Sequence, residues 1–314
     1  MAEATYLNPG VSVDHTPTTA MAAGEVRQYP DGRAFFAPTE IPAGKKGSVT
    51  VEGIVKVAKT ASMVMLKGSR VFWDASANKA HLLHANNATD FYFGIVQETA
   101  ASAATIVKVA INANPKYTID LGDGFWSVPI STAGWPHIIG HKEGVSMIFD
   151  VTAEAQKLDA LSNIGIPVDT PCLVEAEVCI NLNGDDAAFD FGVGLANTTH
   201  ATSTDDITET LLIHTDGASL DINAESDDGS TEVAATDTTK DAVVGTPFLA
   251  QFDLSDYEDI QLYINGVNVL PDSVFKLNAA TGPLKLLAHM VKSSNNSPGN
   301  ITVRRLGLRT YTEV

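Results

Sequence analysis

The stretch Val49-Thr50-Val51-Glu52-Gly53-Ile54-Val55-Lys56-Val57 decides the fold class of the first part of the chain. Apolar and polar residues alternate along it with a period of two, as in a strand with one buried face. Further short runs rich in β-branched and aromatic residues follow, separated by turns of small and polar residues. These runs are Arg70–Trp73, Phe91–Gln97 and Thr105–Ile111. Short strands at this spacing are typical of a small closed β-barrel.

The second half of the chain also has a β pattern, over a longer stretch. Asn265-Gly266, between two apolar runs, predicts a tight hairpin. The strands that we expect here are Cys172–Ile180, Phe189–Leu195, Thr210–His214, Ser219–Ala224, Thr246–Asp253, Ile260–Ile264, Leu284–Val291 and Ile301–Thr310. So many short strands predict a two-sheet sandwich. One short helix is expected over Val151–Ser162, with Thr152 as its N-cap and Gly165 beyond its end.

The net charge differs between the first and second parts of the chain. We expect an extended N-terminal arm over residues 1–20 that becomes ordered by lying on another molecule, a barrel over 21–114 and a sandwich over 115–314. Residues 1–114 carry 10 Lys+Arg and 9 Asp+Glu, a net charge of +1. Residues 115–314 carry 10 Lys+Arg and 29 Asp+Glu, a net charge of −19, so the whole chain has a net charge of −18. A domain this acidic repels nucleic acid and anionic membranes, so we expect neither as a partner.

Composition excludes further classes of protein. No run of about 18 apolar residues is present, so we expect no membrane span. No secretion signal is visible at the N-terminus, which predicts a chain made in a cytoplasm. The two cysteines, Cys172 and Cys179, are seven residues apart on one predicted strand and point to opposite faces, so they cannot pair within it.

Residues 1–114 resemble the tailed-phage head decoration, or capsid cement, proteins. The landmarks are Ala22–Val26, Ile41–Gly44, Val51–Val55, Lys67–Asp74, Gly94–Val96 and Val107–Ile111, in this order and spacing. The resemblance implies a protein of the virion that binds the outer surface of the head. It would bridge major capsid protein subunits and stabilise the shell, as a homotrimer at local threefold positions, after synthesis in the host cytoplasm. Within the arm, the candidate capsid-binding residues are Tyr6, Leu7, Val11 and Val13.

Residues 170–310 more weakly resemble the concanavalin-like or laminin-G-like jelly roll. The resemblance rests on His214–Ile222, Phe252–Leu254, Gln261–Gly266 and Gly282–Leu284. Some jelly rolls of this kind bind sugars, which implies an alternative: a carbohydrate-binding adhesion module on the virion, with a surface glycan as partner. A third interpretation is a tail or fibre component, although the chain shows no internal repeat.

The acidic turns of the second half are the candidates for a cation site. Residues 169–241 hold 17 carboxylates and one lysine, Lys240, with acidic turns at Asn183–Asp186, Asp205-Asp206 and Asp227–Gly229. None has the spacing of a known calcium loop, so we expect no tight calcium site, no other metal, no cofactor and no strong glycan binding. A nucleophile elbow and a phosphate-binding glycine loop are also missing, which predicts a protein that is not an enzyme.

Three tryptophans and three arginines complete the set of candidate residues. Trp73 is expected in the barrel core. Trp126 and Trp135 lie in a Gly/Pro-rich segment near the domain junction and are candidates for an inter-domain or subunit contact. The remaining candidates are basic residues that either pair with carboxylates at a domain contact or lie on a solvated strand edge. They are Arg304, Arg305 and Arg309.

Overall fold

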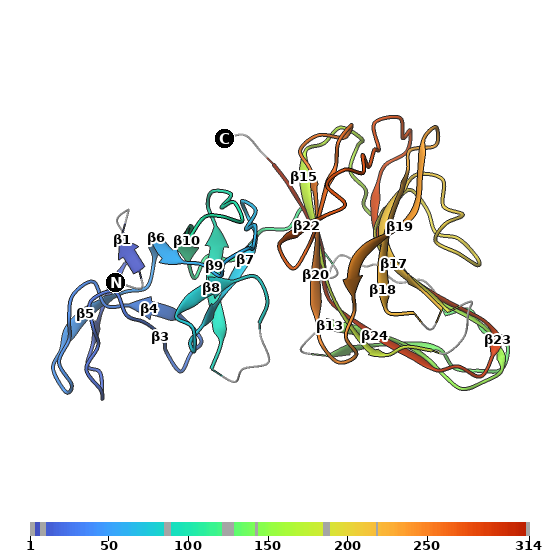
Figure 1. The fold of residues 1–314 in the computed structure, drawn as a ribbon. Helices are drawn as coiled ribbons and strands as arrows, with labels where there is room; N and C mark the ends of the chain where they lie inside the picture. Colours follow the sequence, from blue (N-terminus) through green and yellow to red (C-terminus); the bar gives the residue numbers. More distant parts are fainter. Residues whose placement is uncertain are drawn as a thin grey trace. The chain divides into compact units, whose positions relative to one another are not determined.

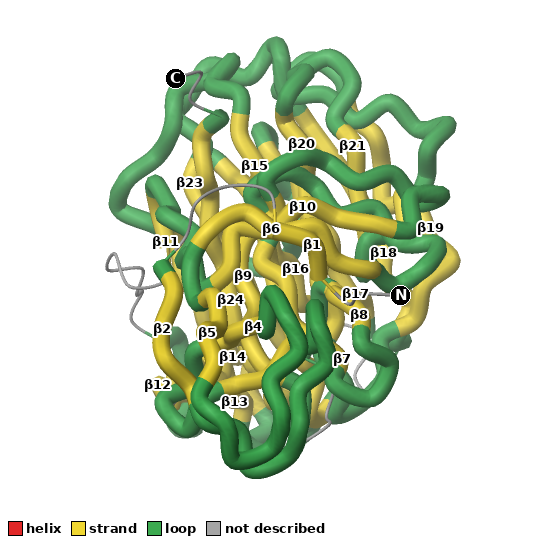
Figure 2. Tube along the Cα trace, turned by 90° about the vertical axis from the view of Figure 1, so that its left-hand side faces the viewer, coloured by secondary structure: helices red, strands yellow, loops and turns green. Residues whose placement is uncertain are grey.

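The chain is built of β-strands in two compact units. The computed structural model describes residues 4–6, 11–84, 89–120, 129–141, 144–184, 189–217 and 219–311. The first unit comprises Met1–Lys116 with Asn265–Val267, and the second Tyr117–Ile264 with Asn268–Val314. Figure 1 traces the strands along the chain, and Figure 2 shows only strands and loops. The predicted all-β class is confirmed, and no helix among these residues is long and apolar enough to cross a membrane.

The first unit contains two antiparallel sheets. The six-stranded sheet has the order β1 (Ala4–Tyr6), β6 (Gly53–Ala58), β10 (Ile106–Ile111), β9 (Phe91–Val96), β7 (Arg70–Asp74), β8 (Lys79–His81). The four-stranded sheet has the order β2 (Ser12–His15), β5 (Gly47–Thr50), β4 (Ala34–Phe36), β3 (Val26–Gln28).

The six-stranded sheet curls back on itself. Lys59, just after β6, forms a parallel bridge with Ala80 of β8. The N–H of Thr60 donates to the carbonyl of Ala80 at 2.9 Å. Because β8 is at the far end of the sheet from β6, this bridge closes the predicted small barrel. Trp73 is buried as expected, and its ring centroid lies 5.3 Å from that of Phe93.

The N-terminal segment contributes a strand to each sheet of its own unit. β1 pairs antiparallel with β6, and β2 pairs antiparallel with β5. The segment is therefore extended, and its described strands have partners within the chain. This pairing differs from the expectation that residues 1–20 become ordered only on another molecule.

The second unit contains two larger antiparallel sheets. One has the order β12 (His137–His141), β13 (Gly144–Phe149), β24 (Gly299–Thr310), β15 (Cys172–Leu182), β20 (Phe248–Leu254), β21 (Gln261–Ile264), β22 (Val267–Val269), with β11 (Ile119–Asp120) also on β24. The other has the order β14 (Glu154–Leu161), β23 (Lys285–Asn295), β16 (Asp190–Ala196), β17 (Thr210–Asp216), β18 (Asp221–Asp227), β19 (Glu232–Asp241). The expected hairpin is β21–β22, and Asn265 and Gly266 have the positive φ angles, 51° and 76°, of a tight turn.

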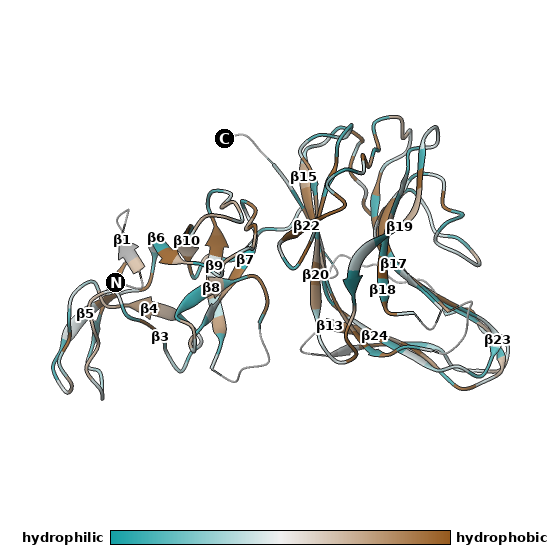
Figure 3. Cartoon of the chain, in the orientation of Figure 1, coloured by the Kyte–Doolittle hydropathy of each residue, from teal (hydrophilic) through white to brown (hydrophobic). Residues whose placement is uncertain are grey.

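Both sheets contribute to one hydrophobic core. Val174 and Phe252 enter it from the first sheet, and Val193, Ile213 and Leu286 from the second. Figure 3 shows hydrophobic residues along β20, in contrast to β19 at a sheet edge, where hydrophilic residues gather. The predicted two-sheet sandwich is confirmed. Both cysteines are buried.

The predicted helix over Val151–Ser162 is wrong, because Glu154–Leu161 forms strand β14 and pairs antiparallel with β23. The segment is rich in helix-forming residues, but its alternation also fits a strand. Leu158 and Ala160 enter the core, whereas Asp159 lies on the opposite face. Burial against a sheet outweighs intrinsic helix propensity here, since propensity differs by only about 0.7 kcal/mol per ordinary residue.

Two of the three C-terminal arginines are buried in the second unit. The guanidinium Nη2 of Arg309 lies 2.6 Å from Oε2 of Glu175, and that of Arg305 lies 2.5 Å from Oε2 of Glu177. Gln251 Nε2 also donates to Glu175 Oε1 at 3.0 Å. Because both glutamates belong to β15, the neighbour of β24, the pairing of these two arginines is internal to one sheet. The expectation that Arg305 and Arg309 lie at a domain contact or on a solvated strand edge is therefore wrong.

Candidate functional site

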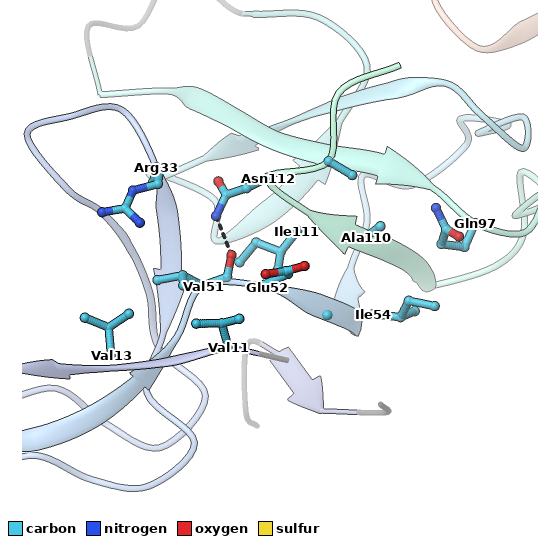
Figure 4. Close-up of a pocket in the computed structure, with 12 residues that line it drawn as sticks. Val11, Val13, Arg33, Val51, Glu52, Ile54, Gln97, Ala110, Ile111 and Asn112 are labelled. Carbon is cyan, nitrogen blue, oxygen red and sulfur yellow. Dashed lines mark hydrogen bonds between the residues drawn. The ribbon is translucent and has the colours of Figure 1, made fainter. Parts of the chain in front are cut away.

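A hollow of about 560 Å³ lies in the first unit, where the two sheets meet. Its walls are mostly aliphatic and its rim is polar, as Figure 4 shows. The lining residues are Val11, Val13, Arg33, Val51, Glu52, Gly53, Ile54, Gln97, Ala110, Ile111, Asn112 and Ala113.

Strand pairing places the two N-terminal valines at this hollow. Val13 of β2 is opposite Val49 of β5, and the N–H of Val51 donates to the carbonyl of Val11 at 3.0 Å. The side chain of Val11 is 52% exposed, and that of Val13 is half-buried. A half-exposed aliphatic pair beside a hollow is suited to contact with an apolar side chain of another protein.

Asn112 ties the two sheets together behind the hollow. Its Oδ1 accepts from the N–H of Ala34 at 2.8 Å, and its Nδ2 donates to the carbonyls of Ala34 and Val51 at 2.8 and 2.7 Å. Its φ is +56°, a conformation that asparagine adopts more easily than most residues. The amide, which directly follows β10, therefore satisfies backbone groups of β4 and of the residue after β5. The hollow is thus held in shape before any partner binds.

Polar and charged groups surround the aliphatic wall. Arg33 is exposed, and its Nη2 lies 2.8 Å from Oδ2 of Asp31. Hydrogen bonds from Arg33 lower the pKa of the Asp31 carboxyl. Glu52 and Gln97 supply an acid and an amide at the same rim. An apolar centre with a polar rim is the usual anatomy of a protein–protein interface.

The predicted site residues fall in different places. Val11 and Val13 lie together at the hollow, whereas only the backbone of Tyr6, in β1, is described. Leu7 and Trp126 lie outside the described residues. The remaining lining residues come from segments far apart in sequence, such as Arg33 and Asn112. The alternation of Val49–Val57 indicates which side chains are exposed, but no sequence signal indicates that these segments meet.

Trp135 lies in the second unit and is 77% exposed. Two carboxylates hold its loop: Asp150 accepts from the N–H of Trp135, and Glu154 accepts from the N–H groups of Ala133 and Gly134 at 2.8 and 2.6 Å. Burial would raise the pKa values of Asp150 and Glu154, but these hydrogen bonds outweigh it and lower both. The Trp135 ring centroid lies 5.4 Å from that of His137, beside a second hollow of about 520 Å³. The exposed ring of Trp135 on a fixed loop is suited to contact with another surface. Its role in an inter-domain or subunit contact stays a prediction.

Comparison with known proteins assigns the first unit. The phage cement protein family matches residues 7–111. Residues 7–111 are therefore similar to this family. The match contains Val11, Val13 and the other lining residues up to Ile111, and the resemblance drawn from the sequence landmarks is confirmed. No curated protein matches the chain.

Several solved structures are similar to part of the chain at low identity. The Emp47p carbohydrate recognition domain has 8% identity and a TM-score of 0.42, covering 57% of this chain and 87% of that one. The carbohydrate-binding module CBM66 from Bacillus subtilis has 8% identity and a TM-score of 0.37, covering 56% and 92%. The VIP36 exoplasmic/lumenal domain has 12% identity and a TM-score of 0.40, covering 56% and 82%. Similarity at this level carries no argument about function.

Proposed function

We propose that this protein is a head decoration protein that binds the outer surface of a phage capsid through its N-terminal unit. The observation that carries the proposal is the match of residues 7–111 to the phage cement protein family, a range that contains most residues lining the hollow. The partner is the major capsid protein. The role is adhesion without catalysis: each copy bridges neighbouring subunits and stabilises the assembled shell, because a ligand that binds only the assembled state favours that state.

The hollow around Val11 is the contact surface in this proposal. Its aliphatic wall would receive an apolar side chain of the capsid protein, and its charged rim would set the orientation of the contact. The acidic second unit faces solvent. Its negative charge is suited to keeping virions apart and to solubility.

The protein works as a homotrimer at local threefold positions in this proposal. One unit offers limited contact area, and three linked copies multiply the avidity without any new contact. A cryo-EM map of decorated shells tests this directly. Density for single copies away from threefold positions contradicts the trimer, whereas it leaves capsid binding itself intact.

Val11→Asp is expected to weaken shell binding by about 30-fold or more, since a central interface residue is worth about 2 kcal/mol or more. The new carboxylate would be desolvated at the apolar centre of the contact. Val11 is half-exposed, so the fold should persist. Co-sedimentation of full-length protein with undecorated shells of its own phage, over a range of concentrations, gives the change in affinity.

Val243→Asp is the matched control, because Val243 is a 60% exposed valine of the second unit. It should bind shells as the unaltered protein does. Equal occupancy by the two variants would show that the hollow is not the contact surface.

A further inference from the structure

A buried polar layer lies on the face of the six-stranded sheet of the second unit that points away from the core. On β16 and β17, Phe191 and Ile213 enter the core, whereas Asp190 and His214 lie on the opposite face. Glu225 of the neighbouring β18 lies on this face too, since Ala224 enters the core. Figure 2 labels these three strands. Charged groups under cover need partners, because an unpaired buried charge is costly.

The segment of residues 197–209, which joins β16 to β17, covers this layer. Ile207 packs with Ala196 and Leu287 on the sheet. The N–H and the hydroxyl of Thr204 donate to Oδ2 of Asp190 at 3.0 and 3.1 Å. The neighbouring residue, Asp205, is exposed, so the layer is open to solvent at one point.

His214 has two different nitrogens in this layer. Its side chain is buried, and Nδ1 lies 2.8 Å from Oδ1 of Asp216. Nε2 makes no hydrogen bond among the described residues and lies 3.7 Å from Oε2 of Glu225. Oε1 of Glu225, which is 5% exposed, also lacks a hydrogen-bond partner within the described part of the chain. Two buried polar atoms, Nε2 of His214 and Oε1 of Glu225, therefore have no hydrogen-bond partner among the described residues.

A metal ion accounts for this geometry better than a hydrogen bond does. His214, Glu225 and Asp205 each offer one ligand atom, and these atoms lie within 4.8 Å of one another. A separation of 3.7 Å is too long for a hydrogen bond. Two ligand atoms bound at about 2.1 Å to one tetrahedral metal ion lie about 3.4 Å apart. The observed separation is close to that value.

We propose that His214, Glu225 and Asp205 form a binding site for a divalent cation of the zinc class. The hydrogen bond from Nδ1 to Asp216 makes Asp216 the residue that orients the imidazole and leaves Nε2 free to bind the metal. Exposure at Asp205 leaves an open coordination position. An imidazole with two carboxylates suits Zn²⁺, whereas Ca²⁺ needs six to eight oxygen ligands. The bound ion would pin the covering segment to the sheet.

Asp190, His214 and Asp216 form a second group within the same distance limit. In that group Nδ1 of His214 is already bonded to Asp216 and Oδ2 of Asp190 accepts from Thr204, while Oδ1 of Asp190 has no hydrogen-bond partner among the described residues. We therefore assign Asp216 an orienting role and place the ion at Nε2. The spacing of acidic residues in the sequence predicts no metal site. The proposal differs from that prediction because the fold brings together residues of one loop and two strands.

The pKa values of His214 and Glu225 are both raised in this site. Burial raises the pKa of Glu225 to about 8. Burial disfavours charged His214, but the hydrogen bond to Asp216 and the charges of Glu225 and Asp190 outweigh it and raise its pKa to about 9. The other charged group facing the site is Asp205.

Titration of chelator-treated full-length protein with ZnCl2 in a calorimeter tests the site. One Zn²⁺ per chain is expected to bind, with a rise in the melting temperature. Asp205→Asn and Glu225→Gln should each weaken binding about 100-fold or more, and Asp216→Asn by about 10–100-fold. Asp205 is exposed, so its variant keeps the test valid even where a buried variant fails to fold.

His200→Asn is the matched control, because His200 lies on the same covering segment and its Nδ1 is 3.5 Å from Oδ2 of Asp206. This exposed pair is where an adventitious ion would bind. Zinc binding that persists in His200→Asn and is lost in Asp205→Asn supports the proposal. Binding lost only in His200→Asn, no zinc binding at all, or binding of CaCl2 in preference to ZnCl2 would each overturn it.

Discussion

Glu175→Ala is expected to lower the free energy of unfolding of the second unit by about 3–5 kcal/mol, the usual cost of removing one partner from a buried ion pair. Glu175 is fully buried, and its Oε2 lies 2.6 Å from Nη2 of Arg309 and 3.8 Å from Nη1 of Arg305. Both guanidinium groups would lose their contact with this carboxylate while they remain in a buried position. Burial disfavours the charge of Arg305, but the nearby carboxylates, with Glu175 first among them, raise its pKa. Arg305 therefore stays charged.

Urea unfolding of the full-length protein, followed by circular dichroism, measures this loss. Hydrogen exchange of peptides from β15 and β24 assigns it to the second unit. Glu232→Ala is the control, because Glu232 is an exposed glutamate on the edge strand β19, and it should change stability by no more than about 0.5 kcal/mol. A loss below about 1 kcal/mol in Glu175→Ala would show that solvent or other groups stabilise the two arginines.

Local patterns in the sequence are enough to predict many strands of this protein. The alternation of Val49–Val57 predicts one strand, but the structure divides this stretch between β5, which ends at Thr50, and β6, which begins at Gly53. Within β6 the alternation holds, since Val55 and Val57 are buried and Lys56 is exposed. Asn265-Gly266 predicts the β21–β22 turn, because few other residue pairs adopt two successive positive φ angles. Both signals are local, so they need no knowledge of the partner strands.

Properties that depend on which strands become neighbours could not be predicted in this way. The segment Glu154–Leu161 fits a helix as well as a strand until β23 is known to lie beside it. Arg305 and Arg309 look like surface residues until β24 is placed next to β15 with Glu177 opposite Arg305. Register between distant strands decides whether such a side chain has a partner.

The candidate sites show the same limit. The acidic turn at Asp205 lacks the spacing of a calcium loop. Ligand spacing of this kind describes one loop only, so it gives no information about residues on other strands. The structure places it beside His214 and Glu225, which lie on two different strands. At the hollow, Val11 and Val13 were selected from the family resemblance, whereas Arg33 and Asn112 become lining residues only through sheet pairing.

Trp73→Ala is expected to lower the free energy of unfolding of the first unit by about 3–5 kcal/mol, because it removes a large core side chain and leaves a cavity. Trp73 is 1% exposed and is the largest fully buried side chain described. It lies on β7, between β8 and β9, with its ring against Phe93. Native-state hydrogen exchange of the β7 and β9 amides measures the change within the full-length chain.

Trp135→Ala is the matched control for this variant, since it removes the same side chain from a position that is 77% exposed. Its effect on stability should stay within about 0.5 kcal/mol. The Trp73 variant should also lose shell binding at temperatures where the barrel opens, because the hollow with Val11 and Val13 depends on the strands of the first unit. If both tryptophan variants exchange equally slowly in β7 and β9, Trp73 does not hold the barrel core together, and the stability of the first unit lies in the four-stranded sheet and its own cluster around Phe35.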